Sequence, residues 1–215
     1  EEFYLVDLYY RRTLEAYHEL ITKENPIEQT LSSAKRQLDL EYAKITNVLN
    51  LEWLTCVREK GAWFTETGLK HQEDFYKNES DTSVKQVVIV CDALRYEVAK
   101  ELMQELAKEK HIATIDAYQA MLPTETKYCK PALLPHHSLE LNGTDMMVDG
   151  TLLTTTEQRT AHLGKYREGA ICTRFEDVMN GDAQSMRELF KRPLVYIFYD
   201  SIDEAGHSQS PFEVI

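Results

Sequence analysis

The stretch QVVIVCDALRYEVAKELMQELAKE, residues 86–109, decides the fold. It opens with a short, continuous run of apolar and mostly β-branched residues, which is typical of a strand buried on both faces of a parallel sheet. From Ala93 onward the apolar residues recur with helical periodicity, and IATIDAY, residues 112–118, is interpreted as a second strand. Strand, helix and strand in this order predict the beginning of a βαβ unit.

Another apolar strand is predicted within KRPLVYIFYD, residues 191–200, from Leu194 to Phe198. Both apolar strands end at an acidic residue, because Asp92 follows the first and Asp200 the second. Two such strands indicate an α/β fold with a central, mostly parallel sheet and helices on both faces. In open sheets of this kind, ligands bind at the carboxyl ends of the strands, so we expect the functional site there.

Residues 1–83 are expected to form a helical N-terminal region, because their apolar residues recur at helical spacing between charged ones. Asn25-Pro26 should separate a first helix from a second, since the residue before a proline is disfavoured in helical conformation. The polar stretch KNESDTS, residues 77–83, is rich in turn formers and is interpreted as the boundary to an α/β domain, residues 84–215. The chain opens without Met and stops at SPFEVI, so we interpret it as a truncated part of a longer protein.

The composition narrows the class of protein. Acidic residues outnumber basic ones, 36 to 24, and this excess argues against broad nonspecific binding to nucleic acid. The four cysteines form no CxxC pair, so we expect reduced thiols and no thiol-bound zinc. No apolar run reaches the roughly 18 residues that a membrane span needs, and the start lacks a signal peptide. A cytoplasmic protein without membrane contact is expected.

Asp92 is the first candidate site residue, because it follows a strand at the ligand-binding edge of the predicted sheet. Its carboxylate could bind a metal, accept a phosphoryl group or cap the following helix. Arg95 and Glu97 follow within one turn, either as a surface pair or as partners that support the site. The sequence leaves these alternatives open.

Residues 122–126 read Leu-Pro-Thr-Glu-Thr and lead into a short predicted helix. A hydroxyl in this turn would lie near free backbone N–H groups, which suit a bound phosphate; an ordinary Thr cap or hydroxyl turn is the alternative. His136 and His137 follow soon after. Adjacent side chains diverge, so we interpret both as facing the surface or a substrate rather than one metal ion.

Asp203 and His207 form the third candidate group, four residues apart after the last predicted strand. A carboxylate oxygen and an imidazole nitrogen suit zinc or a similar divalent ion, and Gly206 would let a loop bend toward it. We expect both side chains to point into the same cleft as Asp92, because both segments follow buried strands of one sheet. Asp200 is a less certain candidate, since a strand-end Asp also satisfies neighbouring backbone amides.

Three segments together resemble the PglZ domain, a branch of the alkaline phosphatase superfamily found in BREX phage-defence systems. They are IVCDALRYEVAKEL, MLPTETKYCKPALLP and VYIFYDSIDEAGHS, in that order. The resemblance covers residues 84–215 and implies an alkaline-phosphatase-like sheet, with the helical region preceding it as in longer family members. The first segment is the most specific, because the strand, Asp-Ala-Leu-Arg-Tyr-Glu and the helix recur together in that family.

The resemblance implies a phosphoesterase site with two divalent ions, commonly zinc. Asp92 would bind one metal, Thr126 would be the nucleophile that bridges both, and Asp203 with His207 would bind the other. The superfamily pattern also needs an Asp-His pair and a further His, which are expected after Ile215. We therefore expect this fragment by itself to bind metal weakly or not at all.

The implied partners are a phosphoester substrate and other defence-system proteins. The main alternative is a noncatalytic scaffold or switch subunit of a defence complex, with a vestigial metal site. Another alternative keeps the superfamily and changes the substrate to a sulfate ester, a phosphodiester or a nucleotide. A receiver domain would leave the Thr126 segment and the Asp203 and His207 pair unexplained.

Overall fold

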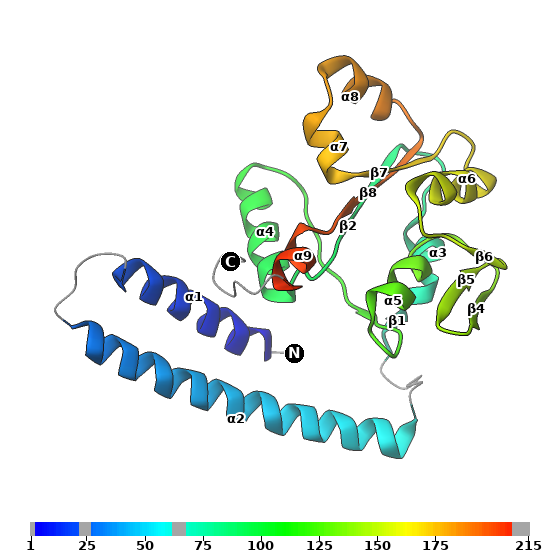
Figure 1. Ribbon diagram of the computed structural model, residues 1–215. Helices are drawn as coiled ribbons and strands as arrows, with labels where there is room; N and C mark the ends of the chain where they lie inside the picture. The colour runs from blue at the N-terminus through cyan, green and yellow to red at the C-terminus, as the bar shows by residue number, and fades with distance from the viewer. Residues whose placement is uncertain (1–2, 22–26, 62–67, 208–215) are drawn as a thin grey trace. The chain divides into compact units, whose positions relative to one another are not determined.

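The computed structural model describes residues 3–21, 27–61 and 68–207 (Figure 1). The chain divides into two compact units. One unit contains residues 1–66 and 94–115, and the other contains residues 67–93 and 116–214. Each unit has its own packing and is described by itself.

The described residues of the first unit form three helices: α1 (Phe3–Ile21), α2 (Glu28–Lys60) and α4 (Tyr96–Lys108). The predicted N-terminal pair of helices is confirmed by α1 and α2, and the expected break at Asn25-Pro26 lies outside the described residues. Helix α4 is the helix predicted after the first apolar strand. Among the residues that the structure describes, no helix is long and apolar enough to cross a bilayer.

Aromatic and polar contacts join α1 to α2. The rings of Tyr10 and Tyr42 are stacked, with centroids 3.8 Å apart and an interplanar angle of 2°. Their hydroxyls reach across to carboxylates on the opposite helix: Tyr10 donates to Asp39 at 3.0 Å, and Tyr42 donates to Asp7 at 2.6 Å. This arrangement fixes the register of the two helices, because each tyrosine ring packs on the other while its hydroxyl is satisfied.

Charged residues join α4 to α1. Glu97 is fully buried, and its Oε1 lies 2.7 Å from Arg95 Nε and 3.9 Å from Arg11 Nε. Arg95 also pairs with Asp7 at 2.9 Å, and Arg11 with Glu101. A buried carboxylate is tolerated only when cations compensate it, so Arg95 and Glu97 are neither a surface pair nor free groups. They are part of the packing between these helices.

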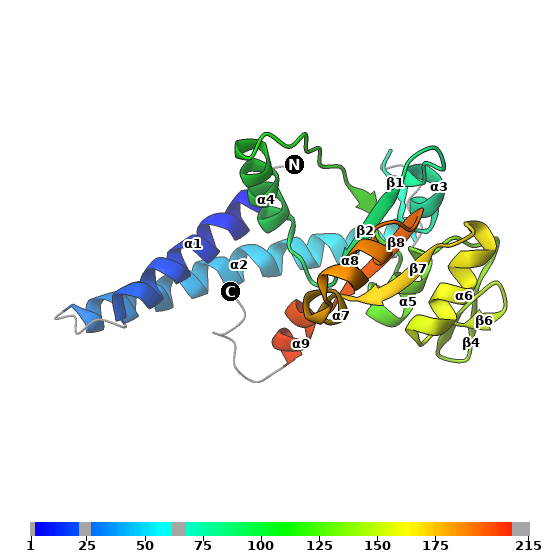
Figure 2. The same cartoon turned by 90° about the horizontal axis from the view of Figure 1, so that it is seen from above.

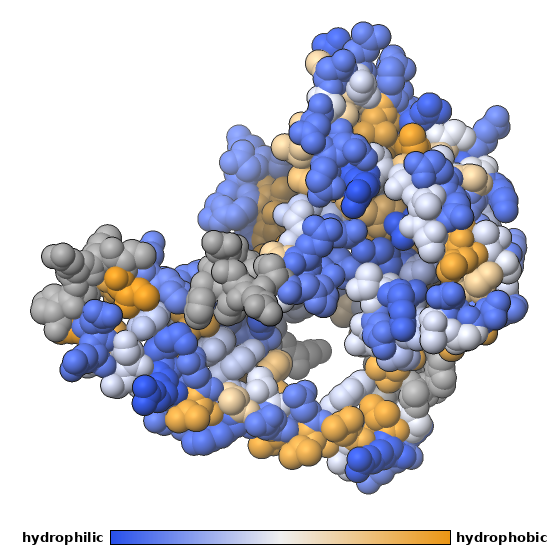
Figure 3. Space-filling model, in the orientation of Figure 1, coloured by the Kyte–Doolittle hydropathy of each residue, from blue (hydrophilic) through white to orange (hydrophobic). Residues whose placement is uncertain are grey.

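Helix α2 keeps an apolar surface that α1 does not cover. With 33 residues α2 is much longer than the 19 residues of α1. Figure 3 shows apolar side chains gathered along the C-terminal half of α2, where Ile45, Val48, Leu51 and Leu54 are exposed.

The second unit is built around a three-stranded parallel sheet in the order β2-β8-β7 (Figure 2). Strand β2 (Gln86–Cys91) pairs in parallel with β8 (Leu194–Tyr199), and β7 (Ile171–Arg174) pairs in parallel with β8 on the other side. Both predicted apolar strands are therefore confirmed, and so is the parallel sheet of an α/β fold. The remaining elements are β1 (Lys70–His71), η1 (Gln72–Asp74), α3 (Phe75–Glu79), β3 (Tyr118–Gln119), α5 (Thr126–Ala132), β4 (Leu139–Asn142), β5 (Asp145–Val148), β6 (Thr151–Leu152), α6 (Thr156–Tyr166), α7 (Phe175–Asn180), α8 (Ala183–Leu189) and α9 (Ser201–His207).

A core cluster lies on one face of this sheet. Leu194, Tyr196 and Phe198 of β8 pack there with side chains from α6 and β5, including Leu163 and Val148. Strand β8 is buried along nearly its whole length, as expected for the central strand. Strand β2 lies at the edge of the sheet, and its outward side chains Val87 and Ile89 are 47% and 59% exposed, so the expected burial on both faces is wrong for β2.

The predicted strand at residues 112–118 is wrong apart from its last residue. Ile112 is fully exposed, and only Tyr118 and Gln119 form a short strand, β3, which pairs with β1 instead of β2. Strand β2 pairs in parallel with β8 over six residues. The polar residues 77–83 include the end of α3 and the turn before β2.

Replacing Glu97 by Gln should lower the free energy of unfolding by about 2 kcal/mol, because Arg11 and Arg95 lose the buried charge that compensates them. Urea unfolding of the full-length protein, followed by its helical circular dichroism, measures this change. The matched control is Glu105→Gln on the same helix, whose exposed carboxylate pairs with the exposed Lys108. The control should change stability by less than about 0.5 kcal/mol. Equal losses in both variants would contradict a structural role for Glu97.

Candidate functional site

Asp92 lies at the carboxyl end of β2, where the pairing with β8 continues one residue beyond the strand. Cys91 is paired with Tyr199, and the Asp92 N–H donates to the Tyr199 carbonyl at 3.0 Å. The chain then turns through Ala93, whose φ of 62° lies in the left-handed region that favours glycine. The parallel register therefore places Asp92 next to Asp200, the residue that follows β8.

Lys130 bridges these two carboxylates. Its Nζ donates to Asp200 Oδ1 at 2.7 Å and lies 3.0 Å from Asp92 Oδ2. The Lys130 side chain is only 11% exposed, so the ammonium is largely withdrawn from water. The buried Asp92 Oδ2 is ion-paired with Lys130 but accepts no hydrogen bond.

The two carboxylates affect the neighbouring thiols. Burial, followed by the charges of Asp92 and Asp200, raises the pKa of Cys91. Burial and the charge of Asp92 also raise the pKa of Cys129. A raised pKa keeps a thiol protonated at neutral pH, so neither cysteine is activated as a nucleophile by these surroundings. All four cysteines are free, as the sequence predicts.

Thr126 is the first residue of α5, as the predicted turn into a short helix requires. The N-cap position belongs to Glu125, so Thr126 is not the cap of this helix. Thr126 is exposed to solvent, and Lys130 follows it four residues later on α5. Residues at this spacing lie on the same face of a helix, so the contact of Lys130 with Asp92 and Asp200 also orients the Thr126 face of α5.

Asp203 and His207 lie on a helix, α9, so the expected loop with a bend at Gly206 is wrong. The helix begins directly after Asp200, whose carbonyl accepts from the Glu204 N–H at 2.9 Å. Asp203 and His207 are four residues apart on this helix, and Asp203 Oδ2 lies 3.6 Å from His207 Nε2. His207 is largely exposed, whereas Asp203 is partly buried.

The candidate residues thus form two pairs, Asp92 with Asp200 and Asp203 with His207. Carboxylate oxygens and an imidazole nitrogen are donor atoms of the kind that divalent ions bind. Asp92 Oδ2, in addition, accepts no hydrogen bond. Within the described ranges, however, no three His, Cys, Asp or Glu residues are grouped closely enough to hold a metal ion. A common cleft for Asp92, Asp203 and His207 stays a prediction.

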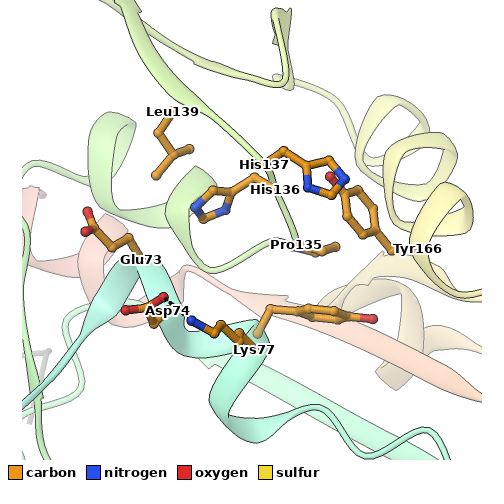
Figure 4. A pocket seen from close by; sticks show the side chains of 9 residues that line it. Glu73, Asp74, Lys77, Pro135, His136, His137, Leu139 and Tyr166 are labelled. Carbon is orange, nitrogen blue, oxygen red and sulfur yellow. Dashed lines mark ion pairs between the residues drawn. The ribbon is translucent and has the colours of Figure 1, made fainter.

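A separate hollow of about 510 Å³ lies between η1, α3 and the segment after α5 (Figure 4). His136 faces this hollow and His137 turns toward Tyr166, so the two imidazoles diverge. His136 Nδ1 lies 2.8 Å from the Leu134 carbonyl, which can only accept, so Nδ1 carries the hydrogen. Asp74 and Lys77 form an ion pair at 3.6 Å on the opposite wall. None of the candidate metal ligands lines this hollow.

Asp149 supports one wall of the hollow. Its carboxylate accepts from the backbone N–H groups of His137 and Ser138, at 2.8 and 2.9 Å, and from the Tyr166 hydroxyl. Burial alone would raise the pKa of Asp149, but these hydrogen bonds outweigh it and lower the pKa to about 2. Burial and the bond to Asp149 raise the pKa of Tyr166 to about 12.

Sequence reasoning gave no role to Lys130 and only a weaker one to Asp200. Lys130 lies 38 positions from Asp92 and 70 from Asp200, so no local spacing indicates their contact. The one usable signal was that Asp200 occupies the same position after its strand as Asp92 does after the first.

Acidic residues at the carboxyl ends of parallel strands define an α/β protein with its candidate site at that edge of the sheet. The model of the BREX system PglZ alkaline phosphatase-like domain matches residues 72–213, more than half of the chain. The chain belongs to this PglZ family, as its three sequence segments predict.

Two curated relatives have names that agree with this family. The chain is 27% identical over 223 residues to the alkaline phosphatase-like protein PglZ of Bacillus cereus (strain H3081.97), an alignment that covers 99% of the chain and 26% of the relative. It is 32% identical over 154 residues to the alkaline phosphatase-like protein BrxZ of Escherichia coli O9:H4 (strain HS), covering 66% of the chain and 18% of that relative. The chain thus spans about a quarter or less of either relative. No solved structure matches it significantly.

Asp149→Asn should lower stability at pH 7 by about 1–2 kcal/mol, after allowance for solvent screening. Because the folded pKa of Asp149 lies below the unfolded value of about 3.9, its contribution is present above pH 4 and is lost as the pH falls toward 2. Thermal midpoints of wild type and variant should therefore converge between about pH 4 and 2. The control is Asp145→Asn, because Asp145 is an exposed carboxylate at the start of β5, in the same β4-β5-β6 sheet. A difference that stays constant from pH 7 to pH 3 would contradict this assignment.

Proposed function

We propose that this chain supplies the front part of the site of a metal-dependent phosphoesterase in a BREX-type phage-defence system. The observation that carries the proposal is the meeting of Asp92 and Asp200 at the carboxyl edge of the sheet, joined through Lys130 to the helix that begins with Thr126. Membership of the PglZ family supports the same reaction class. A cytoplasmic location and association with other defence proteins are part of this proposal.

Each residue has a defined task in the proposed site. Asp92, Asp203 and His207 are the ligands for divalent metal, with zinc as the ion that suits their mixed oxygen and nitrogen donors. When bound, such ions lower the pKa of a coordinated hydroxyl and neutralise charge on phosphoryl oxygens. Thr126 supplies the attacking oxygen, and its exposure at the start of α5 leaves it open to an incoming ester.

A noncatalytic scaffold or switch in a defence complex is the second candidate function. It is favoured by one observation: among the described residues no group of three potential ligands is assembled. The full-length sequence discriminates between the two functions. An Asp-His pair and a further His after Ile215 support the phosphoesterase, and their absence supports the scaffold.

Thr126→Ala should reduce hydrolysis of a simple aryl phosphate by at least about a thousandfold, because the attacking oxygen is removed. Circular dichroism and metal content of the full-length protein should stay at wild-type levels. The matched control is Thr124→Ala, which removes the other hydroxyl of the same segment and should retain substantial activity. The reverse pattern would assign the nucleophile to Thr124. Parallel rates on aryl diesters and aryl sulfates define the substrate class.

A further inference from the structure

Lys130 occupies a position that is unusual for a lysine side chain. Lysine ammonium groups are strongly hydrated and normally remain in water, whereas the Lys130 side chain is only 11% exposed. It lies between two carboxylates that come from different strands of the sheet. By contrast, Lys127 on the same helix is 50% exposed, and its contacts are with the neighbouring residues Glu125 and Tyr128.

The two carboxylates require a cation. Asp92 and Asp200 are 20% and 34% exposed, so water screens their mutual repulsion incompletely. The register of β2 and β8 fixes both residues at one edge, so the repulsion cannot be relieved by moving them apart. The Lys130 ammonium neutralises one of the two negative charges.

We propose that Lys130 is an internal counterion that holds Asp92 and Asp200 together in the metal-free protein and must leave when a divalent ion binds. This inference rests on the proposed metal-dependent function. A divalent cation at Asp92 and the Lys130 ammonium carry charges of the same sign, so they compete for the same carboxylates. Asp92 Oδ2 is buried and accepts no hydrogen bond, so coordination of an ion in place of the lysine would satisfy this oxygen.

Displacement of the Lys130 ammonium by a divalent ion would also affect Thr126, because both residues lie on α5. Both residues belong to a helix of only seven residues, one turn apart. Release of the Lys130 ammonium removes the ion pairs between this helix and Asp92 and Asp200, whereas the hydrogen bond from Tyr196 to the Leu133 carbonyl at its C-terminal end remains. Metal binding and the placement of the Thr126 hydroxyl are therefore coupled through one side chain.

Zinc affinity of the full-length protein tests this competition. After zinc has been removed with a chelator, wild type, Lys130→Gln and the control Lys127→Gln are titrated with zinc against a chelating dye. Lys130→Gln should bind zinc about tenfold more tightly than wild type, and its metal-free form should melt about 2–4 °C lower. Lys127→Gln should resemble wild type in both measurements.

The accessibility of Lys130 in the wild-type protein gives a second measurement that does not depend on a variant. Acetylation by an amine-reactive ester, followed by peptide mass spectrometry, should label Lys130 severalfold more in zinc than in chelator, whereas Lys127 should be labelled in both. Zinc binding without increased labelling, or with unchanged affinity in Lys130→Gln, overturns the counterion role and leaves the metal-dependent function standing. If none of the proteins binds zinc, manganese or magnesium, both proposals fall together.

Discussion

The parallel pairing of β2 with β8 is the constraint on which the candidate site depends. Parallel strands end at the same edge of a sheet, and the in-register pairing of Cys91 with Tyr199 leaves Asp92 and Asp200 as neighbours. The buried side chains of β8 hold this register, because a shift by one residue would exchange the side chains that pack on its two buried faces. Burial of the sheet thus forces two like charges together, and the chain must supply a cation to compensate them.

The compensating cation comes from α5, which links charge to position. A lysine from a flexible surface loop would neutralise the carboxylates without orienting anything else. Lys130 instead lies one turn after Thr126, so the same ion pair that reduces repulsion at the sheet edge also contributes to the placement of the helix that carries Thr126. The ion pairs of Lys130 therefore link the charge of the two strand ends to the placement of Thr126, the candidate nucleophile.

The sequence predicts those elements whose signal is local. Continuous apolar runs identified β2 and β8, and periodicity identified α1, α2 and α4. The segment 112–118 failed because short alternating apolar residues are also compatible with an extended chain outside any sheet. The hairpin turns at Gly143-Thr144 and Asp149-Gly150 were missed although they carried a usable signal, since a glycine in first position and the dipeptide Asp-Gly both favour tight turns between strands. The Lys130 contacts join distant residues, so local patterns could not reveal them.

The motif Asp-Ala-Leu-Arg-Tyr-Glu, residues 92–97, combines two physical tasks. Asp92 belongs to the unit that contains the sheet, whereas Arg95 and Glu97 belong to the helical unit and bind Asp7 and Arg11 there. Asp92 Oδ2 and Glu97 Oε1 are both buried and accept no hydrogen bond, but Glu97 Oε1 lies 2.7 Å from Arg95 Nε and is compensated by charge within the helical packing. Loss of activity after a substitution at position 95 or 97 therefore points to the helical packing first, and only substitutions at Asp92 test the chemistry of the motif directly.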